Sequence, residues 1–144
     1  MSDIRIAKVT AIETAPRGSN LIVVRIDTNQ PGLYGYGCAT FTQRHKAVVT
    51  AIEEYMDQLL RGRDALAIND AWSVMMNSSY WRNGTVLNNE ISGCDMALWD
   101  IAGKAANMPV WQLWGGKVSQ EVPVYRHAVG DDFGRVYETV ASFI

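Results

Sequence analysis

The sequence is poor in cysteine and histidine. Its 144 residues include two cysteines, Cys38 and Cys94, with no Cys-X-X-Cys pair, and two histidines, His45 and His127. Two isolated thiols in an acidic chain without an export signal are typical of reduced, buried cysteines in a cytoplasmic protein. We therefore expect both cysteines to be small core residues. The Walker A, HExxH, EF-hand and GxSxG motifs are absent as well.

Clusters of positive charge and long apolar runs are also missing. The 13 basic and 15 acidic residues give a net charge of −2, and no Lys/Arg cluster could neutralise a nucleic-acid backbone, so we expect no nucleic-acid partner. The N-terminus lacks the basic start and apolar run of a signal peptide. The longest aliphatic run, Leu21–Val24, is far shorter than the roughly 20 residues of a membrane span, so we expect no membrane partner.

The composition is that of an ordinary globular domain, with 48% hydrophobic and 19% charged residues. A length of 144 residues suits one domain and is too short for a TIM barrel, which needs about 250. The first 40 residues predict three strands, over Ile4–Ala15, Asn20–Thr28 and Leu33–Thr40. Because the links between them are short and polar, we expect antiparallel neighbours in a three-stranded meander.

Helical periodicity replaces strand alternation from about Arg44. The apolar residues of one helical face, ending near Gly62, are Ala47, Val48, Ala51, Ile52, Tyr55, Met56 and Leu59. Thr42 stands where an N-cap is needed. A second helix is predicted over 67–79, with Trp72, Met75 and Met76 facing inward.

A third helix has the clearest pattern. Its apolar positions are Ile91, Cys94, Leu98, Ile101 and Ala105. Asn88 or Asn89 is the expected N-cap, and Pro109 ends the helix. Asp100 and Lys104 form an i, i+4 pair that we interpret as surface decoration. Trp99, Trp111 and Trp114 are interpreted as core residues.

The last part of the chain predicts a strand over Val122–Val129 and a helix beginning in Gly134–Ile144. A strand followed by a helix, after strands and then helices, is typical of the start of a new βα series. The predicted helix has an apolar face, and we expect association or poor solubility if nothing covers it.

Few residues suggest chemistry by themselves. His127 lies at the C-terminal end of the predicted strand, where α/β folds bind ligands, although a structural hydrogen bond explains it equally well. Trp81 and Arg82, before a Gly turn, could line a pocket for an anionic or sugar-like ligand or simply pack a helix terminus. Asp131 and Asp132 could ligate a hard cation, but adjacent loop acids are usually solvated. His45 is interpreted as a solvated surface residue. The glycines of the Gly35-Tyr36-Gly37 segment are interpreted as residues that interrupt or end a strand.

Longer motifs resemble the enolase superfamily. Residues 95–104 (DMALWDIAGK) and 107–116 (NMPVWQLWGG) are similar to the signature of its mandelate racemase and muconate-lactonizing branch. Three shorter motifs resemble the mannonate dehydratase (starvation-sensing) subset: 35–40 (GYGCAT), 80–84 (YWRNG) and 124–127 (VYRH). The resemblance extends over essentially the whole chain.

This resemblance implies a longer, two-domain enzyme. Residues 1–121 would form an α+β capping domain, with a three-stranded antiparallel meander followed by a helical bundle, and residues 122–144 would begin a (β/α) barrel. The barrel would bind an essential Mg²⁺ on three carboxylates and carry the acid/base residues, so we expect the metal ligands and catalytic residues to follow Ile144 and the chain alone to be inactive. The family chemistry removes the proton α to a carboxylate, and its dehydratases then lose water to give a 2-keto-3-deoxy sugar acid.

The resemblance also assigns substrate contacts and partners. His127 matches a family histidine that contacts substrate at the end of the first barrel strand, and Thr42 falls where mannonate dehydratases usually carry an Asn that reaches the substrate. With Trp81 and Arg82, these are the expected substrate-binding residues for an acid-sugar substrate in a homo-oligomeric, cytoplasmic enzyme. Because Thr offers one hydroxyl instead of an amide, another sugar acid or weak activity is also consistent. A racemase, epimerase or cycloisomerase of the same superfamily, or a non-enzymatic regulatory paralogue, remains the alternative.

Overall fold

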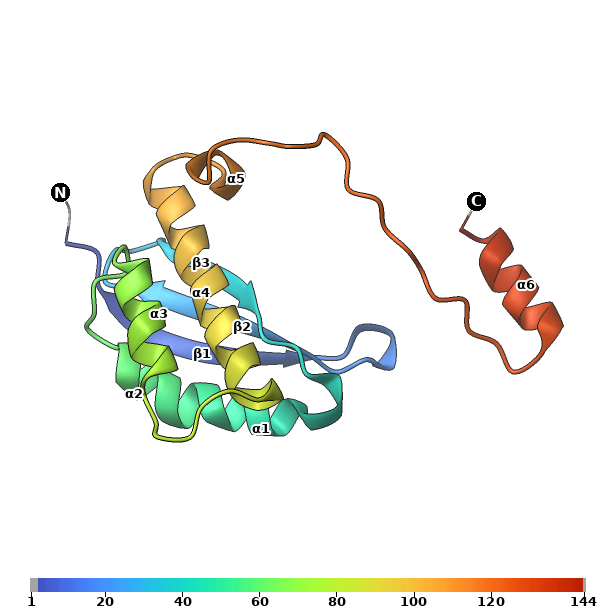
Figure 1. Ribbon diagram of the computed structural model, residues 1–144, viewed down its shortest axis with the longest axis horizontal. Coiled ribbons are helices and arrows are strands. Elements are labelled where there is room, and N and C mark those ends of the chain that lie inside the picture. The colour runs from blue at the N-terminus through green and yellow to red at the C-terminus, as the bar shows by residue number, and fades with distance from the viewer. Residues whose placement is uncertain (1–2, 144) are drawn as a thin grey trace.

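A three-stranded antiparallel sheet forms one layer of the structure, a computed structural model that describes residues 3–143 (Figure 1). Its strands are β1 (Ile6–Thr14), β2 (Leu21–Thr28) and β3 (Tyr34–Cys38), in the spatial order β1-β2-β3. A single 3₁₀ turn, η1 (Pro16–Gly18), joins the first two strands. Alternate residues of the central strand are fully buried: Ile22, Val24 and Ile26. The predicted meander is therefore confirmed, with one face of the sheet directed into the core.

Helices cover that buried face. A 3₁₀ turn, η2 (Thr42–Arg44), leads into a continuous helix made of α1 (His45–Thr50), the π-helical turn η3 (Ala51–Met56) and α2 (Asp57–Leu60). The other two helices of this layer are α3 (Ile68–Met76) and the long α4 (Thr85–Ala105), which crosses the sheet (Figure 1). Buried side chains of these helices form the core with the sheet: Val48, Ile52, Met56, Leu60, Met75, Leu98 and Ile101.

The π-helical turn explains which residues of the first helix are buried. Its four most buried apolar residues, Val48, Ile52, Met56 and Leu60, follow one another at intervals of four. In a regular α-helix such positions drift around the axis, because one turn takes 3.6 residues. The wider turn at Ala51–Met56 counteracts that drift and keeps all four on the sheet. Tyr55, which the α-helical pattern placed inward, is 66% exposed.

The glycines of β3 allow α4 to lie directly against the strand. A Cβ atom on Gly35 would lie 2.0 Å from the backbone oxygen of Ala97, and one on Gly37 would lie 1.9 Å from that of Gly93. No side chain larger than hydrogen fits between the two backbones at these positions. The expectation that the glycines of residues 35–37 only interrupt or end a strand was therefore wrong. They lie within β3 and determine how closely α4 packs on the sheet.

The Asp100–Lys104 pair has a larger structural role than surface decoration. Asp100 Oδ2 accepts a hydrogen bond from the backbone N–H of Tyr36 (2.9 Å) and another from Lys104 Nζ (2.7 Å). Lys104 Nζ also donates to the backbone oxygen of Tyr34 (2.7 Å). Both side chains thus satisfy backbone groups of the edge strand β3 and attach it to α4.

Several local expectations were wrong. Thr42 makes no capping hydrogen bond and lies in η2, and α4 begins at Thr85 rather than at a cap formed by Asn88 or Asn89. Trp72 is 46% exposed, because it lies at the edge of a shallow cavity between α3 and α4 rather than in the core. Cys94 is buried as expected, and burial raises the pKa of its thiol, whereas Cys38 is exposed at the end of the edge strand.

The tryptophans near the end of α4 are more exposed than expected. Trp99 is half-buried and contacts Trp114 edge to face, with 5.4 Å between the ring centroids. Trp114 is itself 65% exposed, and Trp111, in the short helix α5 (Val110–Leu113), is 44% exposed. Their interpretation as core residues was wrong for Trp111 and Trp114, because both rings lie open to solvent on α5 and directly after it.

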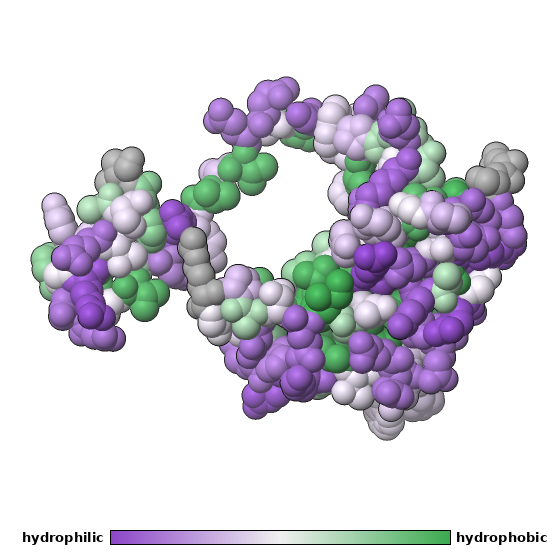
Figure 2. Space-filling model, turned by 180° about the vertical axis from the view of Figure 1, so that it is seen from behind, coloured by the Kyte–Doolittle hydropathy of each residue, from purple (hydrophilic) through white to green (hydrophobic). Residues whose placement is uncertain are grey.

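The chain beyond α5 lies apart from the sheet and helices. Residues 117–130 run in an extended path to α6 (Phe133–Ala141), and Figure 2 shows open space between this segment and the rest of the molecule. The strand predicted over 122–129 is not formed, because a strand needs a neighbour for its N–H and C=O groups and none lies beside it. The predicted helix is confirmed as α6, with Val140 43% exposed; Ile144 lies outside the described residues.

Candidate functional site

A group of polar side chains collects at one end of the sheet, where β1 ends, β2 begins and η2 leads into α1. We call this group the loop-end site and define it by Glu13, Asn20, Thr42, His45 and Lys46. A shallow cavity of about 330 Å³ lies there, lined by Glu13, Thr14, Ala15, Asn20, Leu21, His45 and Lys46. The β1–β2 hairpin places Glu13 next to the start of α1, which lies 32 residues further along the chain.

Glu13 holds the two basic side chains of the loop-end site. Lys46 Nζ lies 2.7 Å from Glu13 Oε2, and His45 Nε2 lies 3.6 Å from the same oxygen, which is an ion-pair rather than a hydrogen-bond distance. His45 Nδ1 lies 3.3 Å from the backbone oxygen of Thr42. Because a carbonyl oxygen can only accept, Nδ1 carries a proton and donates to it, and the contact with Glu13 is an ion pair when Nε2 is protonated as well. The His45 ring is thus oriented at both nitrogens, and the expectation of a freely solvated histidine was wrong.

Thr42 lies beside the cavity and not in its lining, and its backbone oxygen contacts the His45 ring. Its side chain is exposed and does not cap a helix, so its hydroxyl can serve a ligand. With the Lys46 ammonium and the Asn20 amide, the loop-end site offers donors of the kind that bind carboxylate and hydroxyl groups. Glu13 already pairs with the Lys46 ammonium, so a ligand carboxylate would share that ammonium with it.

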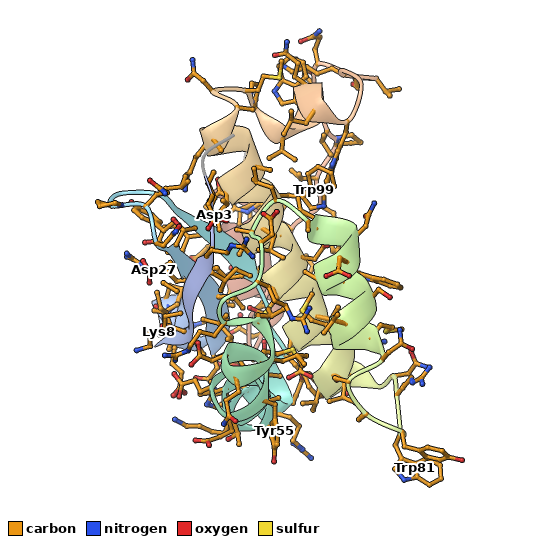
Figure 3. The ribbon with its side chains drawn as sticks, turned by 90° about the vertical axis from the view of Figure 1, so that its left-hand side faces the viewer. Asp3, Lys8, Asp27, Tyr55, Trp81 and Trp99 are labelled. Carbon is orange, nitrogen blue, oxygen red and sulfur yellow. The ribbon has the colours of Figure 1, made fainter. Side chains whose placement is uncertain are left out.

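Trp81 and Arg82 lie on the loop between α3 and α4. Trp81 is 82% exposed and points away from both helices, and its ring contacts that of Tyr80 edge to face, at 5.3 Å between ring centroids (Figure 3). Arg82 Nε donates to the backbone oxygen of Ser79 (3.2 Å). The alternative of a packed helix terminus was wrong, because both rings of this loop are exposed.

His127 lies on the extended segment beyond α5. It is exposed, and its ring contacts Tyr125 edge to face at 5.1 Å. Figure 1 shows this segment away from the sheet and from the helices that cover it, α1 to α4. The structure therefore brings Thr42 together with His45, Glu13 and Lys46, and it does not bring His127, Trp81 or Arg82 to that site.

The described residues do not assemble a metal site. Within residues 3–143, no group of three His, Cys, Asp or Glu side chains is placed to hold an ion. Asp132 caps α6, since its Oδ1 accepts from the backbone N–H of Arg135 (2.9 Å), and Asp131 lies 3.5 Å from the Arg135 guanidinium. The hard-cation alternative for these two acids is thereby replaced by helix capping and an ion pair.

The sequence analysis missed Glu13 and Lys46. They are 33 residues apart and lie in different elements, so no local spacing joins them. The predicted meander was the available signal. In it, the end of β1, the start of β2 and the end of β3 share one end of the sheet, and the first helix begins there.

Comparison with known proteins identifies the family. The sequence profile described as "Mandelate racemase / muconate lactonizing enzyme, N-terminal domain" matches residues 3–115. The chain belongs to this family. The resemblance to the enolase superfamily drawn from residues 95–116 is thus confirmed, and so is the capping-domain fold. Within the described residues of this family member, no helix is both long and apolar enough to cross a bilayer.

Individual relatives of this family member are considerably longer. A "D-galactonate dehydratase family member" of Enterocloster bolteae is 56% identical over 144 residues, which is 100% of this chain and 36% of the relative. One from Enterococcus gallinarum is 53% identical over 99% of this chain and 35% of its own length. The crystal structure of an enolase from Pantoea ananatis with bound D-gluconate and Mg is 50% identical, with a TM-score of 0.86 over 97% of this chain and 34% of that chain. The chain thus spans about a third of the length of the relatives that it matches.

Proposed function

We propose that this chain is the N-terminal part of a Mg²⁺-dependent sugar-acid dehydratase of the D-mannonate/D-gluconate type. The reaction would remove the proton α to the substrate carboxylate and eliminate the β-hydroxyl as water, giving a 2-keto-3-deoxy sugar acid. The observation that carries the proposal is the similarity of 97% of the chain, at 50% identity, to a solved enolase that binds D-gluconate and Mg. Relatives named as D-galactonate dehydratase family members support the same class of reaction.

Residues 1–121 would act as the cap over a barrel that begins within 122–144. Because residues 3–143 hold no cluster of three metal ligands, we place the Mg²⁺ ligands and the acid/base residues in the part of the relatives' length that this chain does not span. The α-proton of a carboxylate is weakly acidic, so its removal needs a metal to stabilise the enediolate and a tuned base within reach. The extended 117–130 segment and α6, whose apolar side chains are exposed, fit a partner surface supplied by that barrel.

The chain's own contribution would be substrate binding through the loop-end site. Lys46 would face the substrate carboxylate, and the Thr42 hydroxyl and Asn20 amide would donate to hydroxyl groups. Three further candidates for substrate binding depend on how the barrel positions the segments that carry them: His127, Trp81 and Arg82. Homo-oligomeric assembly and a cytoplasmic location remain predictions of the resemblance.

The activity test uses the full-length protein that contains this chain. With Mg²⁺, we expect conversion of D-gluconate, D-mannonate or D-galactonate into a 2-keto-3-deoxy acid, measured as the 2-keto product. Removing the metal with EDTA should abolish turnover, and Mg²⁺ should restore it. The 144-residue chain alone should form no product, because its described residues bring no three metal-ligating side chains together.

The same assay separates the alternatives. Exchange of the α-proton with solvent deuterium without loss of water would indicate a racemase or epimerase of the superfamily. Neither exchange nor product with any sugar acid would contradict an enzyme and favour a regulatory paralogue.

A second prediction concerns Lys46. In the full-length enzyme, Lys46→Met should raise KM for the sugar acid about tenfold while kcat changes less than threefold, because an exposed charge-assisted hydrogen bond is worth about 1.5 kcal/mol. Lys8→Met is the matched control, since Lys8 is exposed on β1 and outside the loop-end site. An unchanged KM in Lys46→Met would remove the loop-end site from the proposal.

A further inference from the structure

A groove of about 480 Å³ separates the first helix from the start of α4. Four apolar side chains line it, namely Tyr55, Met56, Leu59 and Leu87. The polar residues at its edge are Gln58, Ser78 and Ser79, and its two charged residues are both acidic, Glu54 and Glu90. No lysine, arginine or histidine lines it. The groove is therefore apolar in its walls and negative in its charge.

Glu90 is the unusual member of this groove. Its side chain is only 2% exposed, and its Oε2 atom has no hydrogen-bond partner in the described structure. A buried carboxylate without a partner is costly, and it is retained only where something compensates it. Burial accordingly raises the pKa of Glu90 to about 7. The groove thus contains one hydrogen-bond acceptor that no residue of the described structure satisfies.

The charged groups around Glu90 do not neutralise it. On its own helix, buried Cys94 and half-buried Asp95 lie one turn further along. On the facing helix, Glu54 is exposed and Asp57 is paired with Arg61. The loop contributes Arg82, whose guanidinium is bonded to the Ser79 backbone oxygen at the groove's edge. Arg61 and Arg82 therefore both have other partners.

The wall opposite Glu90 has an irregular backbone. Glu54, Tyr55 and Met56 belong to the π-helical turn η3, which contacts α4. Such turns cost stability and occur frequently at functional sites, where they redirect side chains. The unpartnered carboxylate and the π-turn are independent observations, and they converge on the same groove.

We propose that this groove binds a primary alkylammonium, with its ammonium on the Glu90 carboxylate and its hydrocarbon chain along Leu59 and Leu87. Charge complementarity selects a cation, because both charged lining residues are acids. A divalent metal ion is less suited, since three ligating side chains are not brought together within residues 3–143. A sugar acid is excluded by its charge, so this inference goes beyond the proposed dehydratase function.

The test is an NMR titration of the 144-residue chain with n-butylammonium chloride at pH 8 and constant ionic strength. We expect saturable shifts of α4 amides around Glu90 with a millimolar Kd. The neutral isostere n-butanol should bind at least tenfold more weakly. Because Glu90 must be ionised while the amine stays protonated, binding should weaken at least fivefold between pH 8 and pH 6.

Two variants isolate the carboxylate. Glu90→Gln should weaken n-butylammonium binding at least tenfold, whereas Glu53→Gln, the same change on the exposed side of the first helix, should leave it unchanged. Equal binding of n-butanol, unchanged binding by Glu90→Gln, or no shifts up to 50 mM amine would each overturn the proposal. Self-association that is lost in Glu90→Gln, without amine binding, would also overturn it and assign the groove to a second copy of the chain.

Discussion

Replacing Gly37 with alanine is expected to cost about 3 kcal/mol of folding free energy. The added Cβ would lie 1.9 Å from the backbone oxygen of Gly93 and 2.9 Å from Met96 Cβ. Neither atom is the end of a flexible side chain, so α4 as a whole must move away from β3. Overpacking of this kind costs about 1–3 kcal/mol and reaches the upper end when backbone has to shift. Urea denaturation of the 144-residue chain, followed by circular dichroism, measures the loss.

Gly134→Ala is the matched control for this change. Its Cβ would meet only Asp132 Oδ1, at 3.3 Å, in the exposed helix α6, so the free energy of unfolding should stay within about 0.5 kcal/mol of the parent. Gly35→Ala should behave like Gly37→Ala, since its Cβ would lie 2.0 Å from the Ala97 oxygen. If Gly37→Ala unfolded at the same urea concentration as the parent, the direct contact of strand and helix would be wrong.

The elements that the sequence predicted correctly are those set by local patterns. Alternation and short polar links identified β1, β2 and β3, and the period of 3.6 identified α4 and the first helix. The strand predicted over 122–129 is not formed, because a strand depends on neighbouring strands and none lies beside it in the described structure. The prediction that Trp111 and Trp114 are core residues was wrong for a similar reason, since an apolar side chain is buried only where a second surface covers it.

The candidate site was predictable only where a motif pointed to it. Thr42 was found through the family resemblance, whereas Glu13 and Lys46 belong to the site because a hairpin folds one against the other. Glu90 carried no signal either, because the predicted cap at Asn88 or Asn89 would put it in the first turn of the helix, where an acidic residue is ordinarily exposed and favourable. Its burial arises from the approach of η3 to α4, which no local spacing encodes.

The stability of the chain should fall as the pH rises from about 4.5 to 7, through the buried Glu90 carboxyl. Burial raises the pKa of Glu90 from 4.5 in the unfolded chain to about 7 in the folded one. The folded state therefore binds this proton more tightly, and its contribution to stability is complete below pH 4.5 and lost as the pH passes 7. A difference of this size corresponds to about 3 kcal/mol.

Comparison with Glu90→Gln separates this effect from the other carboxyl groups. The amide cannot ionise, so the variant should be more stable than the parent by up to about 3 kcal/mol at pH 8, and the advantage should disappear toward pH 4. Ion-paired acids such as Asp57 are common to both proteins and cancel in the difference. Glu53→Gln should give a small difference that does not vary with pH, because Glu53 is exposed. Urea midpoints at pH 4, 5.5, 7 and 8 measure the difference in the free energy of unfolding between each variant and the parent. A difference for Glu90→Gln that does not change with pH would show that Glu90 is ionised or solvated throughout. Such a result would also remove the buried acceptor on which the alkylammonium groove depends.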